Sequence, residues 1–314
     1  MTDALSLADT RCTVLGGGGF LGVHLCRRLV AAGAEVRAFG RRVRFPSALP
    51  DVDWIPGDLA DTSTLAAALD GSDVVFHLVS SATPASANVD TAADVRANVA
   101  PTLELLDACR AAGVARVVFL SSGGTVYGVP EQVPIPETAP TDPITAYGVQ
   151  KLAIEKYLHV HAHLHGLDYR VLRVANAYGP YQTALKNQGA VSAFARAALA
   201  GRPIEIWGDG SVTRDYVYAD DVADACARAA AHVGPERIFN VGTGVGTSLS
   251  DLIAALARQL GRRPEVRLRS ARPLDVPRNV LDVARARDAL GWCPTTDLET
   301  GLARTLAWLH ADSG

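Results

Sequence analysis

The feature that most constrains this chain is a group of glycines between an apolar segment and an amphipathic one. Gly16, Gly19 and Gly22 follow the apolar residues 11–15 and open the helical pattern of residues 20–32. Glycine allows a tight turn and a close approach of the backbone, so the positive end of the helix can face a pyrophosphate. Because both the strand before the loop and the helix after it are present, the sequence predicts a dinucleotide-binding turn.

Short apolar segments alternate with helical patterns through the first half of the chain. Such alternation predicts an α/β fold with a doubly wound parallel sheet of the Rossmann type. Apolar runs such as residues 74–76 indicate burial on both faces of the sheet. Strands are expected at residues 11–15, 35–39, 52–55, 73–78, 116–120 and 169–174, and helices at 20–32, 63–69, 95–112, 146–165 and 191–200.

The pattern changes after Asn176, where glycines and prolines interrupt shorter elements. We expect residues 1–176 to form the dinucleotide-binding domain, with residues 215–243 returning to it. Residues 177–214 and 244–314 are expected to form a smaller C-terminal α/β lobe. This lobe would bind the substrate over the ends of the strands.

Composition argues against several other classes of protein. The formal net charge of −3 gives no basic field for nucleic acid, and no apolar run is long enough to predict a membrane-spanning helix. Residues 1–10 lack the features of a secretion signal. The five cysteines are scattered without a Cys-x-x-Cys pair, which favours free thiols in a reducing cytoplasm. We therefore expect a cytoplasmic protein that binds neither nucleic acid nor membranes.

The end of the second predicted strand bears on the choice of dinucleotide. NAD-binding folds usually have an acidic residue there, which holds the ribose hydroxyls, but here Arg41 and Arg42 follow. A guanidinium can neutralise the 2′-phosphate of NADP. The pair slightly favours NADP, and NAD stays open. Asp58 and Leu59, after the third strand, are placed to reach the adenine.

Tyr147 and Lys151 lie four residues apart on a predicted helix, so they share one face. An ammonium beside a phenol favours the phenolate and lowers its pKa from about 10. A phenol with a lowered pKa can exchange a proton with a sugar hydroxyl at neutral pH. The pair alone is also typical of an ordinary helix surface, and the rest of the chain gives it meaning.

Further motifs occur in a characteristic order, at residues 16–22, 76–80, Asn98, 121–128, 147–151, 173–180, 208–217, 272–277 and 290–292. With these motifs the chain resembles the extended short-chain dehydrogenase/reductase family, in the nucleotide-sugar epimerase/dehydratase branch that includes UDP-glucose 4-epimerases. The resemblance covers nearly the whole chain. It implies hydride removal at a sugar carbon, usually C4, followed by hydride return to the other face of the ketone.

The resemblance also implies roles for individual residues. Tyr147 would be the catalytic acid/base, and Lys151 would hold the nicotinamide ribose. Together with the residues argued above, the predicted cofactor contacts are Gly16, Gly19, Phe20, Leu21, Gly22, Arg41, Arg42, Asp58, Leu59, Leu78, Val79, Ser80, Asn98, Tyr147 and Lys151. The predicted substrate contacts are Ser81, Asn176, Arg214, Arg272, Asp275 and Asn279.

One position departs from the family pattern. The hydroxyl residue that usually assists the tyrosine is replaced by Gly123. Ser122 and Thr125 are adjacent, and we hold them equal as sources of the missing hydroxyl. Both could instead merely cap the loop.

The same loop narrows the reaction, because Gly123 and Gly124 can do no acid/base work. Related dehydratases carry an Asp-Glu pair there, decarboxylases a Glu, and 3,5-epimerases a Cys. Two reactions remain: a 4-epimerase that recycles its bound cofactor, and an NADPH-dependent 4-keto-6-deoxy-sugar reductase. Asn279 stands where hexose-restricted epimerases have a tyrosine, which suggests room for a UDP-N-acetylhexosamine.

Other expectations concern partners and alternatives. A non-catalytic NAD(P)-binding sensor stays open, although Tyr147 and Lys151 are both retained. The resemblance implies a homodimer that packs residues 95–112 and 146–165 into a four-helix bundle, and a product used in polysaccharide biosynthesis. Four histidines alternate along the second of these helices, and their spacing puts neighbours on different faces. No metal site is predicted.

Overall fold

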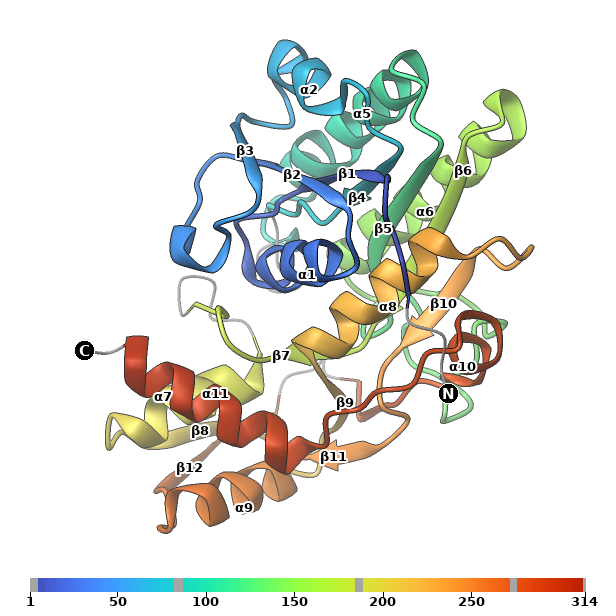
Figure 1. Ribbon diagram of the computed structural model, residues 1–314. Helices are drawn as coiled ribbons and strands as arrows, with labels where there is room; N and C mark the ends of the chain where they lie inside the picture. The colour runs from blue at the N-terminus through green and yellow to red at the C-terminus, as the bar shows by residue number, and fades with distance from the viewer. Residues whose placement is uncertain (1–4, 82–86, 184–188, 272–275, 313–314) are drawn as a thin grey trace.

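The computed structural model of the chain describes residues 5–81, 87–183, 189–271 and 276–312. A seven-stranded sheet lies at the centre of the larger part of the molecule (Figure 1). Its strand order is β10-β6-β5-β4-β1-β2-β3, and all neighbouring pairs are parallel. The predicted doubly wound fold is confirmed. The strands are β1 (Arg11–Leu15), β2 (Glu35–Gly40), β3 (Asp53–Pro56), β4 (Val74–His77), β5 (Arg116–Ser122), β6 (Asp168–Val174) and β10 (Ile238–Val241).

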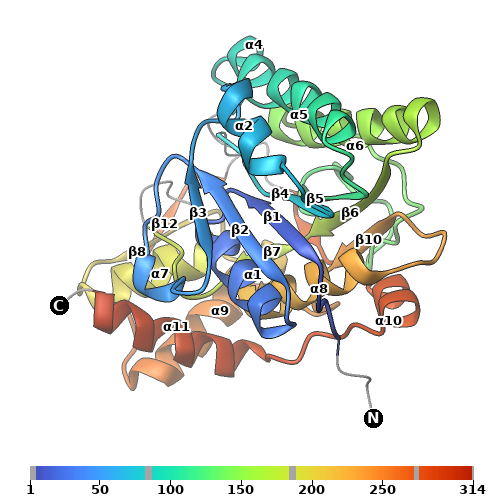
Figure 2. The ribbon, with the colours of Figure 1, turned by 45° about the horizontal axis from the view of Figure 1, so that its top comes forward.

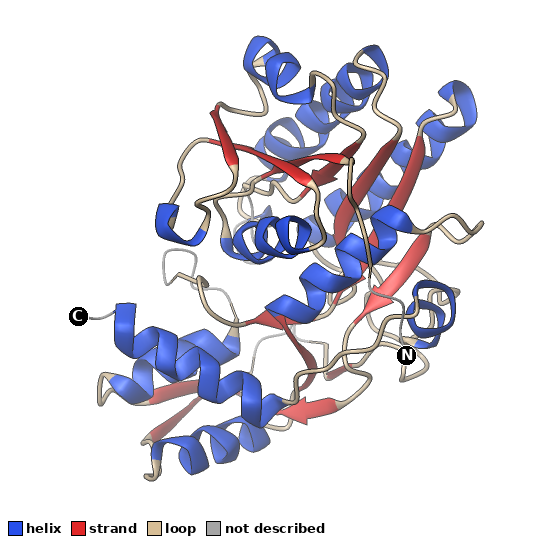
Figure 3. Ribbon diagram, in the orientation of Figure 1, coloured by secondary structure: helices blue, strands red, loops and turns tan. Residues whose placement is uncertain are grey.

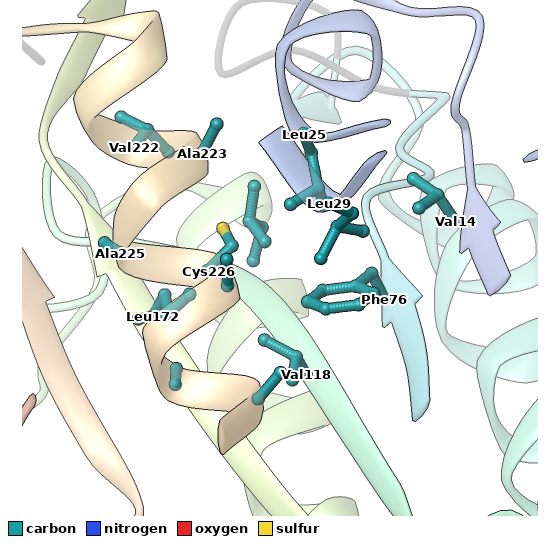
Figure 4. Packing of buried hydrophobic residues seen from close by; sticks show 14 of the residues in the cluster. Val14, Leu25, Leu29, Phe76, Val118, Leu172, Val222, Ala223, Ala225 and Cys226 are labelled. Atoms are coloured by element: carbon teal, nitrogen blue, oxygen red, sulfur yellow. The ribbon is translucent and has the colours of Figure 1, made fainter. Parts of the chain in front are cut away.

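Helices cover both faces of this sheet, as Figures 1 and 2 show. Alternating side chains of each strand face opposite cores, as the pleat requires. Val14, Phe76 and Val118 pack with α1 (Phe20–Ala31) and α8 (Ala219–Ala231) (Figure 4). Their neighbours Leu15, Val75 and Val117 pack in a second core with α2 (Thr62–Leu69), α5 (Ala100–Ala111) and α6 (Ala146–His165).

Local sequence sets both ends of α6. The hydroxyl of Thr145 accepts a hydrogen bond from the backbone N–H of Gly148 at 3.2 Å, which caps the first turn. Gly166 ends the helix in the left-handed conformation, with φ of 72°. The helix therefore begins and ends at the predicted residues.

The predicted helix over residues 95–112 is interrupted in its first turns. A short helix, α4 (Thr91–Asp94), runs into a π-helical turn, η2 (Val95–Val99), before α5 begins. Pro101 has no N–H to donate to the carbonyl of residue 97, so the regular bond pattern fails at this point. The wider turn buries Asn98.

The C-terminal part adds two small sheets and three packed helices (Figure 3). Its core gathers residues such as Phe194, Ile204, Tyr216, Leu252 and Leu302. The elements are β7 (Asn176–Tyr178), β8 (Ile204–Trp207), β9 (Thr213–Tyr218), β11 (Gly246–Ser248), β12 (Val266–Arg269), β13 (Arg278–Asn279), α7 (Ala190–Leu199), α9 (Leu249–Leu260) and α11 (Leu298–Asp312). Two further short elements are η1 (Pro46–Ala48) and α10 (Ala284–Leu290).

The chain crosses between the two parts more than once. Within residues 215–243, α8 packs on α1, and β10 pairs with β6. From further along the chain, Ala286 and Leu290 of α10 enter the core beside α8. The predicted domain limits themselves remain a prediction. Among the described residues, no helix has the length and apolarity needed to cross a membrane.

Candidate active site

The glycine loop joins the carboxyl end of β1 to the start of α1. Gly16 adopts φ of 87°, a left-handed value that favours glycine, and its N–H donates to the carbonyl of Phe39 at 2.8 Å. A Cβ on Gly22 would lie 2.7 Å from the Cα of Gly17, and one on Gly17 would lie 2.6 Å from the Cβ of Ala38. The backbone therefore packs where side chains cannot fit. Such close backbone packing is the geometry expected of the predicted pyrophosphate-binding turn.

The start of α1 is also open to a ligand. Its N-cap is Gly19, which has no side chain to satisfy the first backbone N–H groups. Those N–H groups and the helix dipole favour an anion. Phe20 and Leu21 form the first turn, as predicted, and both are only partly buried.

The ends of β2 and β3 bring the predicted adenosine contacts together. The guanidinium Nε of Arg41 lies 3.8 Å from a carboxylate oxygen of Asp58, and both side chains are exposed. Arg42 is also exposed, and a Cβ on Gly18 would collide with its carbonyl oxygen. Leu59 is buried. The glycine loop and Arg42 therefore border one another.

The segment after β4 lies against the glycine loop. The backbone nitrogen of Val79 is 3.4 Å from the place of a Cβ on Gly16, and Leu78 donates to the carbonyl of Leu15 at 3.1 Å. Ser81 ends the described segment and is exposed. The predicted cofactor residues of β1 and β4 thus meet at the point where the strand order reverses, which is where doubly wound sheets bind ligands.

Tyr147 and Lys151 lie on the first turns of α6. Lys151 is buried, and its ammonium donates to the carbonyl of Leu120 at 2.8 Å. The same nitrogen is 5.7 Å from the ring centre of Tyr147 and 4.7 Å from that of Phe119. A hydrogen bond joins Tyr147 to Ser80, in the segment after β4. The helix therefore brings the predicted acid/base pair next to the predicted cofactor residues.

The prediction that Lys151 brings the pKa of Tyr147 below its usual value is wrong. Burial raises the pKa of Tyr147 to about 12, the hydrogen bond from Ser80 opposes this rise, and the charge of Asp94 adds to it. Loss of hydration destabilises the phenolate more than the neighbouring groups stabilise it. Tyr147 must therefore lose its own proton before it can act as a base.

The loop after β5 explains the glycine at position 123. A Cβ there would lie 2.5 Å from the Leu281 side chain and 2.9 Å from the carbonyl of Arg173, so a serine would overpack the loop. A Cβ on Gly124 would make only ordinary contacts, at 3.8 Å and beyond. The hydroxyl oxygen of Thr125 is buried and has no hydrogen-bond partner among the described residues. Ser122 ends β5 and is partly buried. The roles of these two hydroxyls remain predictions.

The sequence model of the NAD dependent epimerase/dehydratase family matches residues 12–242. The chain belongs to this family. The match includes the glycine loop, the Tyr147–Lys151 pair and the strands that bring them together. The predicted membership of the extended short-chain dehydrogenase/reductases, and with it an enzyme, is confirmed.

Individual members of the family resemble the chain over nearly its full length. The UDP-glucose 4-epimerase of Mycolicibacterium smegmatis is 38% identical over 311 residues, which cover 96% of this chain and 99% of that protein. The crystal structure of the Thermotoga maritima UDP-glucose 4-epimerase with UDP-glucose is 34% identical, has a TM-score of 0.92, and covers 97% of this chain and 100% of its own. The Thermus thermophilus UDP-glucose 4-epimerase in complex with NAD is 35% identical, with a TM-score of 0.88 and coverage of 96% and 99%.

The substrate residues predicted from the family motifs gather on one small sheet. Asn176, Arg214 and Asn279 lie on the adjacent strands β7, β9 and β13. The amide nitrogen of Asn279 donates to the carbonyl of Gly123 at 3.1 Å, and its buried oxygen has no partner among the described residues. A Cβ on Gly124 would lie 3.8 Å from the Asn176 side chain. Arg272 and Asp275 lie outside the described residues.

Arg214 is held in place by backbone groups. One of its terminal nitrogens donates to the carbonyls of Thr213, at 2.9 Å, and of Val276, at 2.6 Å. These bonds tie β9 to the segment before β13. Arg214 is therefore held next to Val276, which follows the predicted substrate residue Asp275 in the sequence.

A buried polar network supports the loop after β5. Arg173 pairs with Glu155 at 2.7 Å, and both side chains are almost fully buried. Glu155 also accepts from the hydroxyl of Ser121 at 2.5 Å, while Arg173 donates to the hydroxyl of Tyr127 at 3.0 Å. Tyr127 donates onward to Asn240 of β10 at 2.7 Å. These bonds join β5, α6, β6 and β10 directly beneath the loop.

Sequence reasoning missed several groups near the predicted acid/base pair. Asp94 is buried and bonded to Asn98, and no periodic pattern marked it. His77 is buried between β4 and α5, and burial with the charge of Lys151 lowers its pKa to about 3, so the ring is neutral. Ser80 was predicted as a cofactor contact, not as the hydroxyl beside Tyr147. In the described part of the chain, no three His, Cys, Asp or Glu side chains gather as metal ligands would.

Proposed function

We propose that the chain is a nucleotide-sugar 4-epimerase, which oxidises C4 of a UDP-hexose and reduces it again from the other face. The observation that carries this proposal is the meeting of Tyr147 and Lys151 with the glycine loop across the segment after β4. The similar proteins described above are UDP-glucose 4-epimerases. UDP-glucose and UDP-galactose are therefore the substrates that we expect first.

In this mechanism the bound NAD supplies the hydride acceptor and donor. Tyr147 removes the proton of the C4 hydroxyl during oxidation and returns it during reduction. Tyr147 must be a phenolate before oxidation, and it is a neutral phenol while it holds the C4 proton. The ammonium of Lys151 and the hydroxyl of Ser80 would stabilise that phenolate. Asn176, Arg214 and Arg272 would hold the nucleotide diphosphate, because charge-assisted hydrogen bonds suit that group, and Asp275 would hold the nucleotide ribose.

The loop after β5 supports C4 chemistry alone. Gly123 and Gly124 have no acid or base to act at C5 or C6. The side chain of Leu281 fills the space beside Gly123 where the usual hydroxyl residue would lie. Proton transfer at C4 then depends on Tyr147 with Ser80, and on Ser122 or Thr125 if the substrate draws them in.

Replacement of Tyr147 by Phe provides the direct test. We expect kcat for interconversion of UDP-glucose and UDP-galactose to fall about 1,000-fold, which is typical for loss of a general acid/base. Tyr157→Phe is the matched control, because Tyr157 is exposed on the same helix. A Tyr147→Phe variant with unchanged activity would instead favour the non-catalytic sensor, or a different acid/base.

Cofactor identity separates the epimerase from the reductase. Arg41 lies within ion-pair distance of Asp58, which favours NAD over a 2′-phosphate at this place. We therefore propose NAD, whereas Arg41 and Arg42 taken alone favoured NADP. The purified protein is denatured and the released nucleotide identified. Retained NAD supports the epimerase. An enzyme that is purified without a bound nucleotide, binds NADPH and reduces a 4-keto-6-deoxy sugar would be the reductase.

Sugar specificity is tested with UDP-glucose and UDP-N-acetylglucosamine side by side. Asn279 is smaller than the tyrosine of hexose-restricted relatives, so we propose that the pocket also accepts the N-acetyl group. Asn279→Tyr should then reduce turnover of the N-acetyl sugar selectively. A wild type that turns over UDP-glucose but not UDP-N-acetylglucosamine would count against this proposal.

We also propose that the enzyme works in the cytoplasm as a homodimer. Exposed apolar side chains line one side of α6, namely Val149, Tyr157, Val160 and Leu164, and Val95 is exposed beside α5. Exposed apolar side chains along one side of a helix are typical of a contact between copies. Val160→Glu with Leu164→Glu should halve the mass measured by light scattering. Val233→Glu, at an even more exposed apolar site elsewhere, should leave the mass unchanged.

A further inference from the structure

Asp94 is a buried carboxyl group that the mechanism above does not use. It is 6% exposed and ends α4, immediately before the π-helical turn. The side-chain nitrogen of Asn98 donates to its carboxylate oxygen and to its backbone carbonyl, both at 3.0 Å. Four residues separate the two positions, so they share one side of the helical segment.

These bonds fix which way the amide of Asn98 points. With its nitrogen toward Asp94, the amide oxygen faces Ser81, where it accepts from the backbone N–H at 2.9 Å and from the hydroxyl at 3.0 Å. Both donors and both acceptor positions of the amide are then used. The opposite orientation would set oxygen against carboxylate and N–H against N–H. Asp94 therefore selects the orientation that holds Ser81.

Ser81 follows Ser80, whose side chain is hydrogen-bonded to Tyr147. The segment after β4 is thus held at one residue by Asn98 and contacts the phenol at the next. Asn98 has no remaining side-chain hydrogen-bonding capacity in this arrangement, so it acts on the site through Ser81. The line of contacts runs from Asp94 through Asn98 and Ser81 to Ser80 and Tyr147.

The charge of Asp94 also reaches the reacting pair. Burial raises the pKa of Asp94, while the bond from Asn98 and the charge of Lys151 lower it. On α6, the groups that face it are Tyr147, whose pKa it raises, and Lys151. His77 of β4, which is coupled to the same Lys151, is neutral, because burial lowers its pKa to about 3. An anionic Asp94 opposes a second negative charge on Tyr147.

We propose that Asp94 is a positioning residue of the 4-epimerase reaction, which fixes Ser80 and Ser81 against Tyr147 through Asn98 and sets the pH range in which Tyr147 transfers its proton. This inference rests on the proposed function for its kinetic part. Its structural part, the hold on Ser81, stands independently of any substrate.

Two substitutions separate the two effects. Asp94→Asn keeps an acceptor for Asn98 and removes the charge, whereas Asp94→Ala removes both. Asp107→Asn is the control, because Asp107 is an exposed carboxylate on α5. The readouts are hydrogen exchange at the Ser81 amide, followed by mass spectrometry on a peptide that includes it, and the pH profile of kcat with UDP-glucose.

Asp94→Ala should speed exchange at Ser81 about tenfold and lower kcat about tenfold, because the hydrogen bond opens more often. Asp94→Asn should leave exchange within about twofold and shift the rising limb of the kcat profile about half a pH unit toward acid. Asp107→Asn should change neither. If Asp94→Ala does not fold, Asp94→Asn still tests the charge.

The proposal is overturned if Asp94→Ala exchanges like the control at Ser81, or if Asp94→Asn leaves the pH profile in place. A wild type that epimerises no UDP-sugar would refute the proposed function while leaving the exchange result to be judged alone. Thermal unfolding of each variant excludes general destabilisation, which would speed exchange in many peptides rather than in this one.

Discussion

The predicted cofactor half and the predicted substrate half of the site are held by different means. In the cofactor half, the glycine loop is fixed by backbone packed on backbone, as at Gly22 against Gly17. In the substrate half, a single fully buried carboxylate, Asp215 on β9, holds three segments together. Its oxygens accept from Thr243 N–H and hydroxyl at 2.7 Å, from Gly244 N–H at 3.1 Å and from Leu281 N–H at 3.3 Å.

The comparison shows that close packing and buried polar contacts fail differently. A glycine contact fails when a side chain is added, whereas a carboxylate contact fails when a side chain is removed. The glycine contacts leave a characteristic spacing that can be recognised in the sequence. The carboxylate contact leaves no such pattern, because Asp215 lies in a polar run that resembles a surface turn.

The largest loss of unfolding free energy is expected from Asp215→Ala. Three backbone N–H groups and a hydroxyl lose their acceptor in a buried place, which should lower the free energy of unfolding by about 4 kcal/mol. Urea unfolding measures this loss. Asp209→Ala, at an exposed carboxylate that accepts from Ser211 in its own turn, should cost less than about 1 kcal/mol. Equal losses of unfolding free energy in the two variants would show that Asp215 does not hold the three segments together.

A smaller loss is expected from Gly22→Ala. The new Cβ would meet the carbonyl of Gly16 and the Cα of Gly17, and such overpacking costs up to about 3 kcal/mol. Cofactor retention after gel filtration should fall with it, because the loop must move. Gly124→Ala is the control, since its Cβ makes only ordinary contacts. If Gly22→Ala lowered the free energy of unfolding more than Asp215→Ala, the buried carboxylate would no longer be the stronger of the two supports.

Gly123→Ser tests the boundary between the halves. The serine would collide with Leu281, and we expect a loss of about 2 kcal/mol by overpacking. Adding Leu281→Ala removes the colliding side chain, so the double variant should lose less than the sum of the single losses. A double-mutant cycle of unfolding free energies gives this coupling. Strict additivity would show that Leu281 does not exclude the hydroxyl.

The smallest change in unfolding free energy is expected at a polar cluster around Asp168, on β6 in the cofactor half. Asp168 is desolvated, but hydrogen bonds from Arg116, Arg170 and Arg237 outweigh this and lower its pKa to about 2. A lowered folded-state pKa stabilises the fold above the unfolded value near 4, and this stabilisation is lost as the pH falls toward 2. Since the carboxylate is partly exposed, we expect about 1 to 2 kcal/mol.

Asp168→Asn should flatten the dependence of unfolding free energy on pH between about 4 and 2. Denaturant unfolding at several pH values measures it for the variant and the wild type. An unchanged slope would show that the three arginines stabilise Asp168 no better than water does. Stabilisation by a carboxylate that joins several segments would then be limited to the substrate half.

Much of the fold followed from local pattern. The ends of α6 and the strand that precedes the glycine loop were predictable because capping residues, glycine and short apolar runs act over a few residues. The pairing of Tyr147 and Lys151 followed from helical spacing. The raised pKa of Tyr147, the contact with Ser80 and the orientation of Asn98 did not, because each depends on burial or on residues distant in sequence. The packing of Leu281 at Gly123 had no local signal either.

The place of β10 has a consequence for how the chain is made. It forms the edge of the central sheet beside β6, yet β6 ends at Val174 and β10 begins at Ile238. On the ribosome, the N-terminal strands emerge with one flank of β6 still unpaired while the intervening residues are synthesised. An open strand edge invites pairing with another chain. Slow translation through residues 175–237 would prolong that exposure, so synonymous codons in this stretch should influence the yield of folded enzyme.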